Sequence, residues 1–180
     1  MPTVISHTAV PLALGLGLGS RLIPPRLLLA GVVASMLPDL DVVGFKLGIA
    51  YANDMGHRGI THSVLFALVA GLFAHYFSPL LKAPPRRAGL FVSAACMSHG
   101  ILDMLTNGGL GIAFLWPFSH ERYFMPWQPI EVSPLALDRV LGARGQVVLL
   151  SELKWVWLPC ILLGMALAVA HLGVRRLKPT

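Results

Sequence analysis

The stretch Ser98-His99-Gly100-Ile101-Leu102-Asp103 stands near the end of an apolar run from Ala88 to Leu105. A histidine and an aspartate four residues apart lie on the same face of a helix, about one turn from each other, so both can bind the same ion or proton. An ionisable group inside a membrane segment costs roughly 2.5 kcal/mol or more unless it faces a cavity, a partner or a metal. Two such groups one turn apart therefore favour a functional site. The alternative is a pair at a helix end that is hydrogen-bonded to a neighbouring helix.

The composition predicts a single membrane-embedded domain. Of the 180 residues, 56% are hydrophobic and 12% are charged, and the mean hydropathy is +0.72. A chain of this kind is too apolar for an ordinary soluble domain and too short for several domains, so residues 1–180 are interpreted as one unit. The net charge of +6 comes from short basic clusters at the ends of apolar runs, which argues against nucleic-acid binding. Cys96 and Cys160 each lie within an apolar run and are expected to be buried small hydrophobes.

Five apolar runs predict an all-α fold, a polytopic bundle of about five transmembrane helices. They cover residues 8–23, 26–37, 60–77, 88–105 and 155–171. The second run barely crosses a bilayer of about 30 Å, so it is expected to continue past Pro38 or to lie in a thinned region. Residues 42–59 are interpreted as a loop with a short interfacial helix, and residues 106–154 as an extracytoplasmic cap on the membrane surface. Gly15 and Gly19 in the first run indicate close helix packing.

The distribution of charge predicts the orientation of this bundle. If the five runs alternate in direction, one side carries eight basic residues and no acidic one, namely Arg21, Arg26, Lys82, Arg86, Arg87, Arg175, Arg176 and Lys178. By the positive-inside rule this side is cytoplasmic. The extracytoplasmic side receives His7 from the first run, Asp39 and Asp41 from the second, His57 and His62 from the third, and His99 and Asp103 from the fourth. Histidines scattered through a core would not converge on one membrane face in this way.

These groups predict a metal site, because imidazole and carboxylate are ligands of zinc and other first-row divalent ions. A site without thiolates suits one or two hydrolytic ions, which lower the pKa of a bound water and polarise a phosphoryl or carbonyl oxygen. Asp39 and Asp41 are candidates both for metal binding and for orienting the water or accepting its proton, and the spacing leaves the choice between them open. Arg58 is a candidate catalytic residue that holds a substrate phosphate, with an ion pair to Asp54 as the alternative. His120 is expected to lie in a solvated turn.

Five motifs follow one another between residue 7 and about residue 130. They are His7, Pro38-Asp39-Leu40-Asp41, His57-Arg58-Gly59-x-Thr61-His62-Ser63, Ser98-His99-Gly100-x-Leu102-Asp103-x-x-Thr106, and Trp116-Pro117-Phe118-Ser119. In this order they resemble the YdjM family, bacterial inner-membrane proteins described as metal-dependent hydrolases, some of them under LexA control. That family is in turn thought to be similar to zinc-dependent phospholipase C and related nucleases, all-helical enzymes that cleave phosphoesters at a zinc cluster.

The resemblance implies which residues bind metal. They are His7, one aspartate of the Asp39/Asp41 pair, His62, His99 and Asp103, and His57 is a further candidate. The secreted enzymes complete a three-metal cluster with an N-terminal tryptophan amine and a later His-x-x-x-Glu. Neither occurs in this sequence, so one or two ions are expected, Zn²⁺ in the first place and Mn²⁺ as the alternative.

The sequence therefore predicts an inner-membrane, metal-dependent hydrolase whose active face is extracytoplasmic. A site at headgroup depth could take a lipid phosphoester sideways from the bilayer, with Arg58 or Arg122 on its phosphate. A metal-binding transporter is one alternative, although polar residues confined to one face argue against it. A structural membrane protein whose metal only joins helices is the other, and a closed four-ligand site would favour it.

Overall fold

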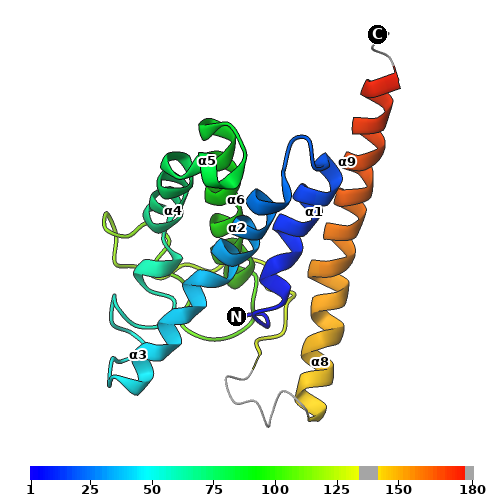
Figure 1. Cartoon of the computed structure of the whole chain (residues 1–180). Coiled ribbons are helices and arrows are strands. Elements are labelled where there is room, and N and C mark those ends of the chain that lie inside the picture. The colour runs from blue at the N-terminus through cyan, green and yellow to red at the C-terminus, as the bar shows by residue number, and fades with distance from the viewer. Residues whose placement is uncertain (134–141, 177–180) are drawn as a thin grey trace.

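The computed structural model describes residues 1–133 and 142–176, with side chains up to Gly173. Within these residues the chain is helical, with two isolated β-bridges and no strand, which confirms the all-α class (Figure 1). The helices are α1 (Ala9–Leu18), α2 (Pro25–Met36), α3 (Val43–Lys46), α4 (Val64–Tyr76), α5 (Ser78–Leu81), α6 (Pro85–Met104), α8 (Ala143–Glu152) and α9 (Leu158–Arg176). Three short 3₁₀ turns are η1 (Ser6–Thr8), η2 (Leu37–Val42) and η3 (Ile60–His62), and a π-helical turn, η4 (Leu153–Trp157), joins α8 to α9. Lys178 and residues 134–141 of the predicted cap lie outside the described residues.

The second apolar run continues past Pro38, as expected. Helix α2 passes into η2 and then α3, so that Pro25–Lys46 forms one helical segment of 22 residues. Proline has no backbone N–H to continue the α-helical hydrogen bonds, and the chain tightens to a 3₁₀ turn beginning at Leu37. This turn carries Asp39 and Asp41, and it thereby sets the direction in which each carboxylate points.

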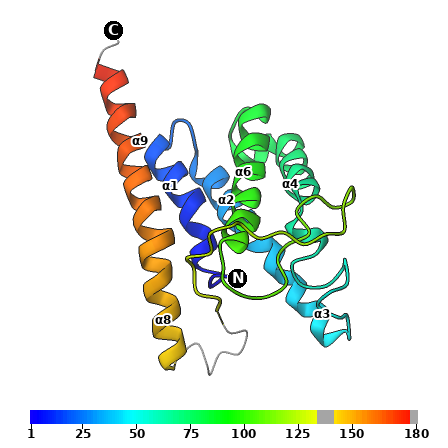
Figure 2. The same cartoon turned by 180° about the vertical axis from the view of Figure 1, so that it is seen from behind.

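The last helix is longer than predicted. It was expected to begin at Trp155, whereas α8 begins at Ala143 and continues through η4 into α9. Arg144 and Gln146 made this part look polar, but both are good helix formers, so the helix extends beyond the apolar run. The segment predicted as a cap covers residues 106–154. Its last part, from Ala143 on, therefore belongs to this helix. Residues 106–133 form an irregular loop across one end of the bundle (Figure 2).

Two helices among the described residues are long and apolar enough to cross a membrane, Pro25–Lys46 and Ala143–Gly173. Helices α1 and α4 have 10 and 13 residues, fewer than the roughly 20 that a bilayer requires. The structure thus supports a helical membrane protein, while the predicted five spans remain a prediction.

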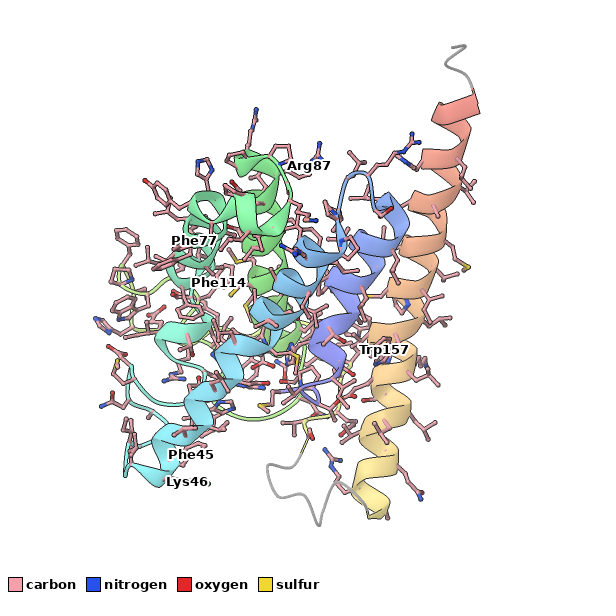
Figure 3. The ribbon with its side chains drawn as sticks, viewed as in Figure 1. Phe45, Lys46, Phe77, Arg87, Phe114 and Trp157 are labelled. Atoms are coloured by element: carbon pink, nitrogen blue, oxygen red, sulfur yellow. The ribbon has the colours of Figure 1, made fainter. Side chains whose placement is uncertain are left out.

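Basic residues gather at one end of the bundle. Arg87 donates hydrogen bonds from Nη1 to the carbonyl of Leu22, and Arg26 donates from Nη1 to the carbonyl of Leu80. Figure 3 shows Arg87 at this end, while Lys46 lies at the opposite end, where α3 stops. The 3₁₀ turns η1, η2 and η3 and the last turn of α6 meet toward the Lys46 end, so the bundle separates the predicted cytoplasmic arginines from the predicted site.

Helix α1 packs along α9 through glycine. A Cβ atom added to Gly17 would lie 2.7 Å from the carbonyl oxygen of Gly164, so the two backbones touch. Gly15 packs closely against Leu28 of α2, in line with its predicted role. The prediction was wrong for Gly19, which ends α1 with a φ of 79° and has nothing within 4 Å of its Cβ position.

Replacing Gly17 by leucine is expected to destabilise the protein by about 1–3 kcal/mol, because the side chain would separate α1 from α9. The gain in helix propensity, about 0.8 kcal/mol, offsets only part of this loss. The free energy of unfolding in a mixed-detergent titration measures the effect. Gly173→Leu is the matched control, since its Cβ position meets nothing within 4 Å. Equal stability of the two variants would contradict the close contact.

Candidate metal centre

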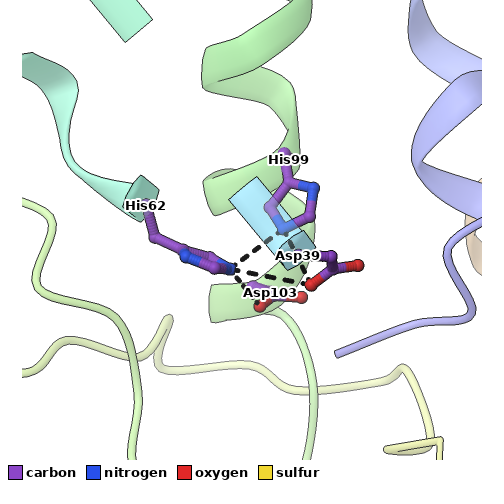
Figure 4. A group of neighbouring side chains, drawn as sticks. All are labelled: Asp39, His62, His99 and Asp103. Carbon is purple, nitrogen blue, oxygen red and sulfur yellow. Dashed lines mark hydrogen bonds and ion pairs between the residues drawn. The ribbon is translucent and has the colours of Figure 1, made fainter. Parts of the chain in front are cut away.

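Four side chains from three segments meet at one end of the bundle: Asp39 on η2, His62 on η3, and His99 and Asp103 on the last two turns of α6 (Figure 4). One ligand atom from each lies within 4.8 Å of the others, and all four residues are buried. His62 directly precedes the residue that caps α4. That residue is Ser63, whose hydroxyl accepts a hydrogen bond from the backbone N–H of Phe66 and so fixes where the helix begins.

The distances within this cluster fit a tetrahedral ion. Nε2 of His62 lies 3.0 Å from Nε2 of His99 and 3.4 Å from Oδ2 of Asp103. Oδ1 of Asp39 lies 3.4 Å from Nε2 of His99 and 3.9 Å from Nε2 of His62. Zinc–ligand bonds of about 2.0–2.1 Å correspond to ligand–ligand distances of about 3.3–3.4 Å in a tetrahedron. The four atoms could therefore hold one ion of this size with small adjustments.

The two histidines are oriented with their Nε2 atoms toward each other. Nδ1 of His99 lies 2.7 Å from the carbonyl oxygen of Ser35, which only accepts, so this nitrogen carries the hydrogen. Nδ1 of His62 lies 3.2 Å from Oδ2 of Asp41, which assigns its hydrogen in the same way. Both Nε2 atoms of the neutral rings then present lone pairs to each other. Such a contact requires a cation between them, either a proton or a metal ion.

The electrostatics of the cluster also favour a cation. Neither oxygen of Asp39 or Asp103 receives a hydrogen bond. Oδ2 of Asp103 forms an ion pair with Nε of Arg58 at 3.0 Å, without the alignment of a hydrogen bond. Burial lowers the pKa of His62, but the neighbouring carboxylates of Asp103 and Asp41 outweigh burial and raise that pKa from 6.5 to about 9. Buried carboxylates without hydrogen bonds are costly unless they are paired or bind a metal.

His7 lies on the other side of the same carboxylates. Its ring is fully buried, stacks on His99 with centroids 3.6 Å apart, and has no hydrogen bond at either nitrogen. Nε2 of His7 lies 3.6 Å from Oδ1 of Asp103 and 3.8 Å from Oδ2 of Asp39. The opposite oxygens, Oδ1 of Asp39 and Oδ2 of Asp103, are the ones that lie nearest to His62 and His99. Each carboxylate therefore presents one oxygen to His7, while the other oxygen of Asp39 faces His62 and His99 and that of Asp103 faces His62.

Asp41 stands behind His62. Its oxygens accept hydrogen bonds from the backbone N–H of Arg58 and the hydroxyl of Thr61, and they lie 2.6 Å from Nδ1 of His57 and 3.2 Å from Nδ1 of His62. Asp41, His57 and His62 could themselves hold an ion. Because donors already occupy both oxygens of Asp41, we interpret Asp41 as the group that orients His62. Spacing left open the choice between Asp39 and Asp41, and the geometry favours Asp39, whose oxygens receive no hydrogen bond, as the candidate ligand.

Asp41→Asn is expected to lower metal affinity by about 10- to 100-fold, because carboxylates that orient a ligating histidine typically contribute this much. Competition with a chromophoric chelator measures the affinity. Asp54→Asn is the control, since Asp54 pairs with the exposed His120 at 2.7 Å and lies outside the cluster. An affinity unchanged by Asp41→Asn would contradict the orienting role.

Arg58 does not lie where a substrate phosphate would require it. Its side chain is fully buried, and besides the ion pair with Asp103 it donates from Nη1 to the carbonyl of Gly108 and from Nη2 to the hydroxyl of Thr106. In place of the predicted phosphate contact and the alternative pair with Asp54, Arg58 pairs with Asp103 and donates to Gly108 and Thr106. Arg122 donates to the carbonyl oxygens of Tyr51, Asn53 and His57 and holds the loop that precedes η3.

Sequence reasoning missed two groups that shape the cluster. The hydroxyl of Thr106 supports Arg58, and its place three residues after Asp103, within the quoted motif, was an available signal. The carbonyl of Ser35 orients His99, and no side-chain pattern could have indicated a backbone atom.

A helical bundle with long apolar helices and a buried His/Asp cluster at one end defines the class, a helical membrane protein with a candidate metal site. The family described as YdjM inner membrane protein matches residues 1–177 of the chain. The chain belongs to this family, which confirms the resemblance seen in the motifs. The inner membrane protein YbcI of Escherichia coli (strain K12) is 53% identical over 167 residues, which cover 92% of this chain and 96% of YbcI. No solved structure matches. Both names support an inner-membrane location, and neither states an activity.

Proposed function

We propose that the protein is a membrane-embedded, metal-dependent hydrolase that cleaves a phosphoester at the extracytoplasmic face. The observation that carries this proposal is the buried cluster of Asp39, His62, His99 and Asp103, with both carboxylates free of hydrogen bonds. A site of imidazoles and carboxylates without thiolates is typical of hydrolytic rather than structural zinc. The resemblance to phosphoesterases supports the choice of substrate bond.

Two adjacent ions fit the arrangement of the ligands. Oδ1 of Asp39, Oδ2 of Asp103 and the Nε2 atoms of His62 and His99 would hold the first. Nε2 of His7 and the remaining oxygens of the two aspartates would hold the second. Such ions supply a water of lowered pKa and polarise the phosphoryl oxygen.

The chain's own residues keep this site in a fixed geometry. Arg58 holds Asp103, Asp41 holds His62, and the carbonyl of Ser35 holds His99. Each ligand therefore has its own support, and a rigid donor set reduces the reorganisation that would otherwise oppose the reaction.

The extracytoplasmic orientation rests on the arginines at the opposite end of the bundle. Arg21, Arg26, Arg86 and Arg87 lie at or near the ends of α1, α2 and α6 that point away from the cluster. Basic residues collect on the cytoplasmic side of inner-membrane proteins. This distribution supports a catalytic face directed away from the cytoplasm.

A structural metal that joins helices is the second candidate function. The first ligand set is buried, has four protein ligands and links η2, η3 and α6, as expected for a closed structural site. This candidate predicts metal-dependent stability without hydrolysis.

The two functions are separated by measurements on the detergent-purified protein. Metal content is determined by mass spectrometry, and hydrolysis is assayed with bis(p-nitrophenyl) phosphate and with a glycerophospholipid. We expect one or two Zn²⁺ or Mn²⁺ ions per chain, loss of activity with a chelator and recovery when metal is added back. His99→Ala should lose both metal and activity, whereas His75→Ala, on the exposed last turn of α4, should retain both. Bound metal and lower stability after chelation, without hydrolysis of either substrate, would favour the structural role. Absence of bound metal would contradict both.

A further inference from the structure

A large apolar cavity opens beside the metal centre, between the two helices that are long enough to cross a membrane. Its volume is about 990 Å³, at the upper end of the roughly 300–1,000 Å³ that is usual for small-molecule sites. Val42, Phe45 and Lys46 of the Pro25–Lys46 helix form one wall. Leu149 and Leu153, on the Ala143–Gly173 helix, belong to the other. Figure 3 shows Phe45 and Lys46 on one side of the bundle and Trp157, also a wall residue, on the other.

Asp39 connects this cavity to the metal centre. It is the member of the four-residue cluster that lines the cavity, and its Oδ2 atom is the one that faces His7. A molecule in the cavity could therefore reach the Asp39 side of the centre. The other three residues of the cluster are covered by protein atoms.

The surroundings of the cavity match the bilayer rather than water. Leu149 and Leu153 are 53% and 57% exposed although they belong to its wall. Leu47, which follows α3, and Leu150 on α8 do not line the cavity and are 73% and 66% exposed. Apolar side chains are thus exposed on the cavity wall and elsewhere on or next to both flanking helices. A ligand that enters between two membrane-crossing helices of this kind would come from the lipid phase.

Charge adds a second requirement for the ligand. Lys46 places an ammonium group on the wall of the cavity, and the metal centre at Asp39 would add positive charge at the inner end. The wall also holds the Glu152 carboxylate, which already accepts hydrogen bonds from the hydroxyls of Thr3 and Ser6. An anionic phosphate attached to a long apolar chain complements both features, whereas a free phosphate would leave the apolar walls in contact with water.

We propose that this cavity binds the hydrocarbon chain of a membrane lipid phosphoester and directs its phosphate to the metal centre at Asp39. The proposal rests on the proposed function for the fate of the phosphate, since the lipid is then the substrate. The binding of the chain depends on the cavity alone and can be tested without any assay of activity.

The test uses a hexadecyl phosphonate with a diazirine in its chain, because its C–P bond resists hydrolysis. The full-length protein in phosphatidylcholine nanodiscs is irradiated with this probe, and the labelled residues are mapped by mass spectrometry. We expect labels on the walls formed by α3 and by α8 with η4. Leu149→Trp and Leu153→Trp should each reduce labelling by about tenfold, because an indole displaces the equivalent of about two buried methylene groups. Leu150→Trp is the matched control, an exposed leucine of the same helix that does not line the cavity, and should label as the unmodified protein does.

The outcomes separate this proposal from the proposed function. Equal labelling of all three variants, or labels confined to other surfaces, would overturn the lipid cavity even if bis(p-nitrophenyl) phosphate is hydrolysed. Labelling that follows the expected pattern would support the cavity, and if no phosphoester is then hydrolysed, the enzyme proposal alone fails. A butyl phosphonate diazirine that labels the walls as strongly as the hexadecyl probe would also overturn it, because binding would then not depend on the chain.

Discussion

Asp39→Asn is expected to abolish stoichiometric metal binding and to lower phosphoester hydrolysis by more than about 100-fold, the upper limit for groups that only support a ligand. The amide keeps the shape of the side chain but removes the charge, and a neutral amide oxygen is a weaker metal ligand than a carboxylate. Both oxygens of Asp39 lack hydrogen bonds in the protein, so the change removes little other than the affinity for a cation. Metal content and the rate with bis(p-nitrophenyl) phosphate are the measurements.

Asp41→Asn is the comparison for this prediction, because Asp41 lies two residues away on the same turn. Its effect should be the weaker one, since Asp41 supports His62 rather than facing the shared centre. Full metal content in Asp39→Asn together with its loss in Asp41→Asn would reverse the assignment and indicate that the ion lies among Asp41, His57 and His62.

Arg58→Met is expected to destabilise the metal-free protein by about 3–5 kcal/mol, the usual cost of removing one partner from a buried ion pair. Arg58 and Asp103 are both fully buried, with Nε and Oδ2 3.0 Å apart. Without the guanidinium, the Asp103 carboxylate loses this partner, and the carbonyl of Gly108 and the hydroxyl of Thr106 each lose a donor. The free energy of unfolding is measured in the presence of a chelator, so that a bound metal does not mask the effect.

The double variant Arg58→Met/Asp103→Asn tests the origin of this cost. It should recover part of the lost stability, because the Asp103 charge is then removed together with its Arg58 partner. Arg86→Met, at the exposed opposite end, should change stability by less than about 0.5 kcal/mol. If the double variant is less stable than Arg58→Met alone, the ion pair is not the source of the effect.

Several features of the site could be predicted from short-range pattern. The helical repeat places His99 and Asp103 on one face of α6, and both do contribute to the cluster. The alternation of apolar runs indicated that the ends carrying His7, Asp39, His62 and Asp103 meet, and the structure brings these four residues together. These inferences needed only periodicity and the order of the runs along the chain.

Other features depended on contacts between distant residues. Arg58 lies in a polar loop, where an exposed side chain is the usual expectation, yet its partners Thr106 and Gly108 are 48 and 50 residues away. The first part of the helix that begins at Ala143 contains too many polar residues to be identified by hydropathy. One of them, Glu152, is buried and accepts hydrogen bonds from the hydroxyls of Thr3 and Ser6 at the other end of the chain.

The sequence by itself determined the all-α class, the approximate positions of the apolar helices and the set of imidazole and carboxylate groups at one end of the bundle. These properties follow from hydrophobicity and helical periodicity, which act over a few residues. Only the tertiary structure decided that Asp39 rather than Asp41 faces the centre, that Arg58 is a buried partner of Asp103, and that an apolar cavity reaches Asp39. Each of these depends on the direction of a side chain relative to another segment, and that direction is set by packing between residues far apart in the chain.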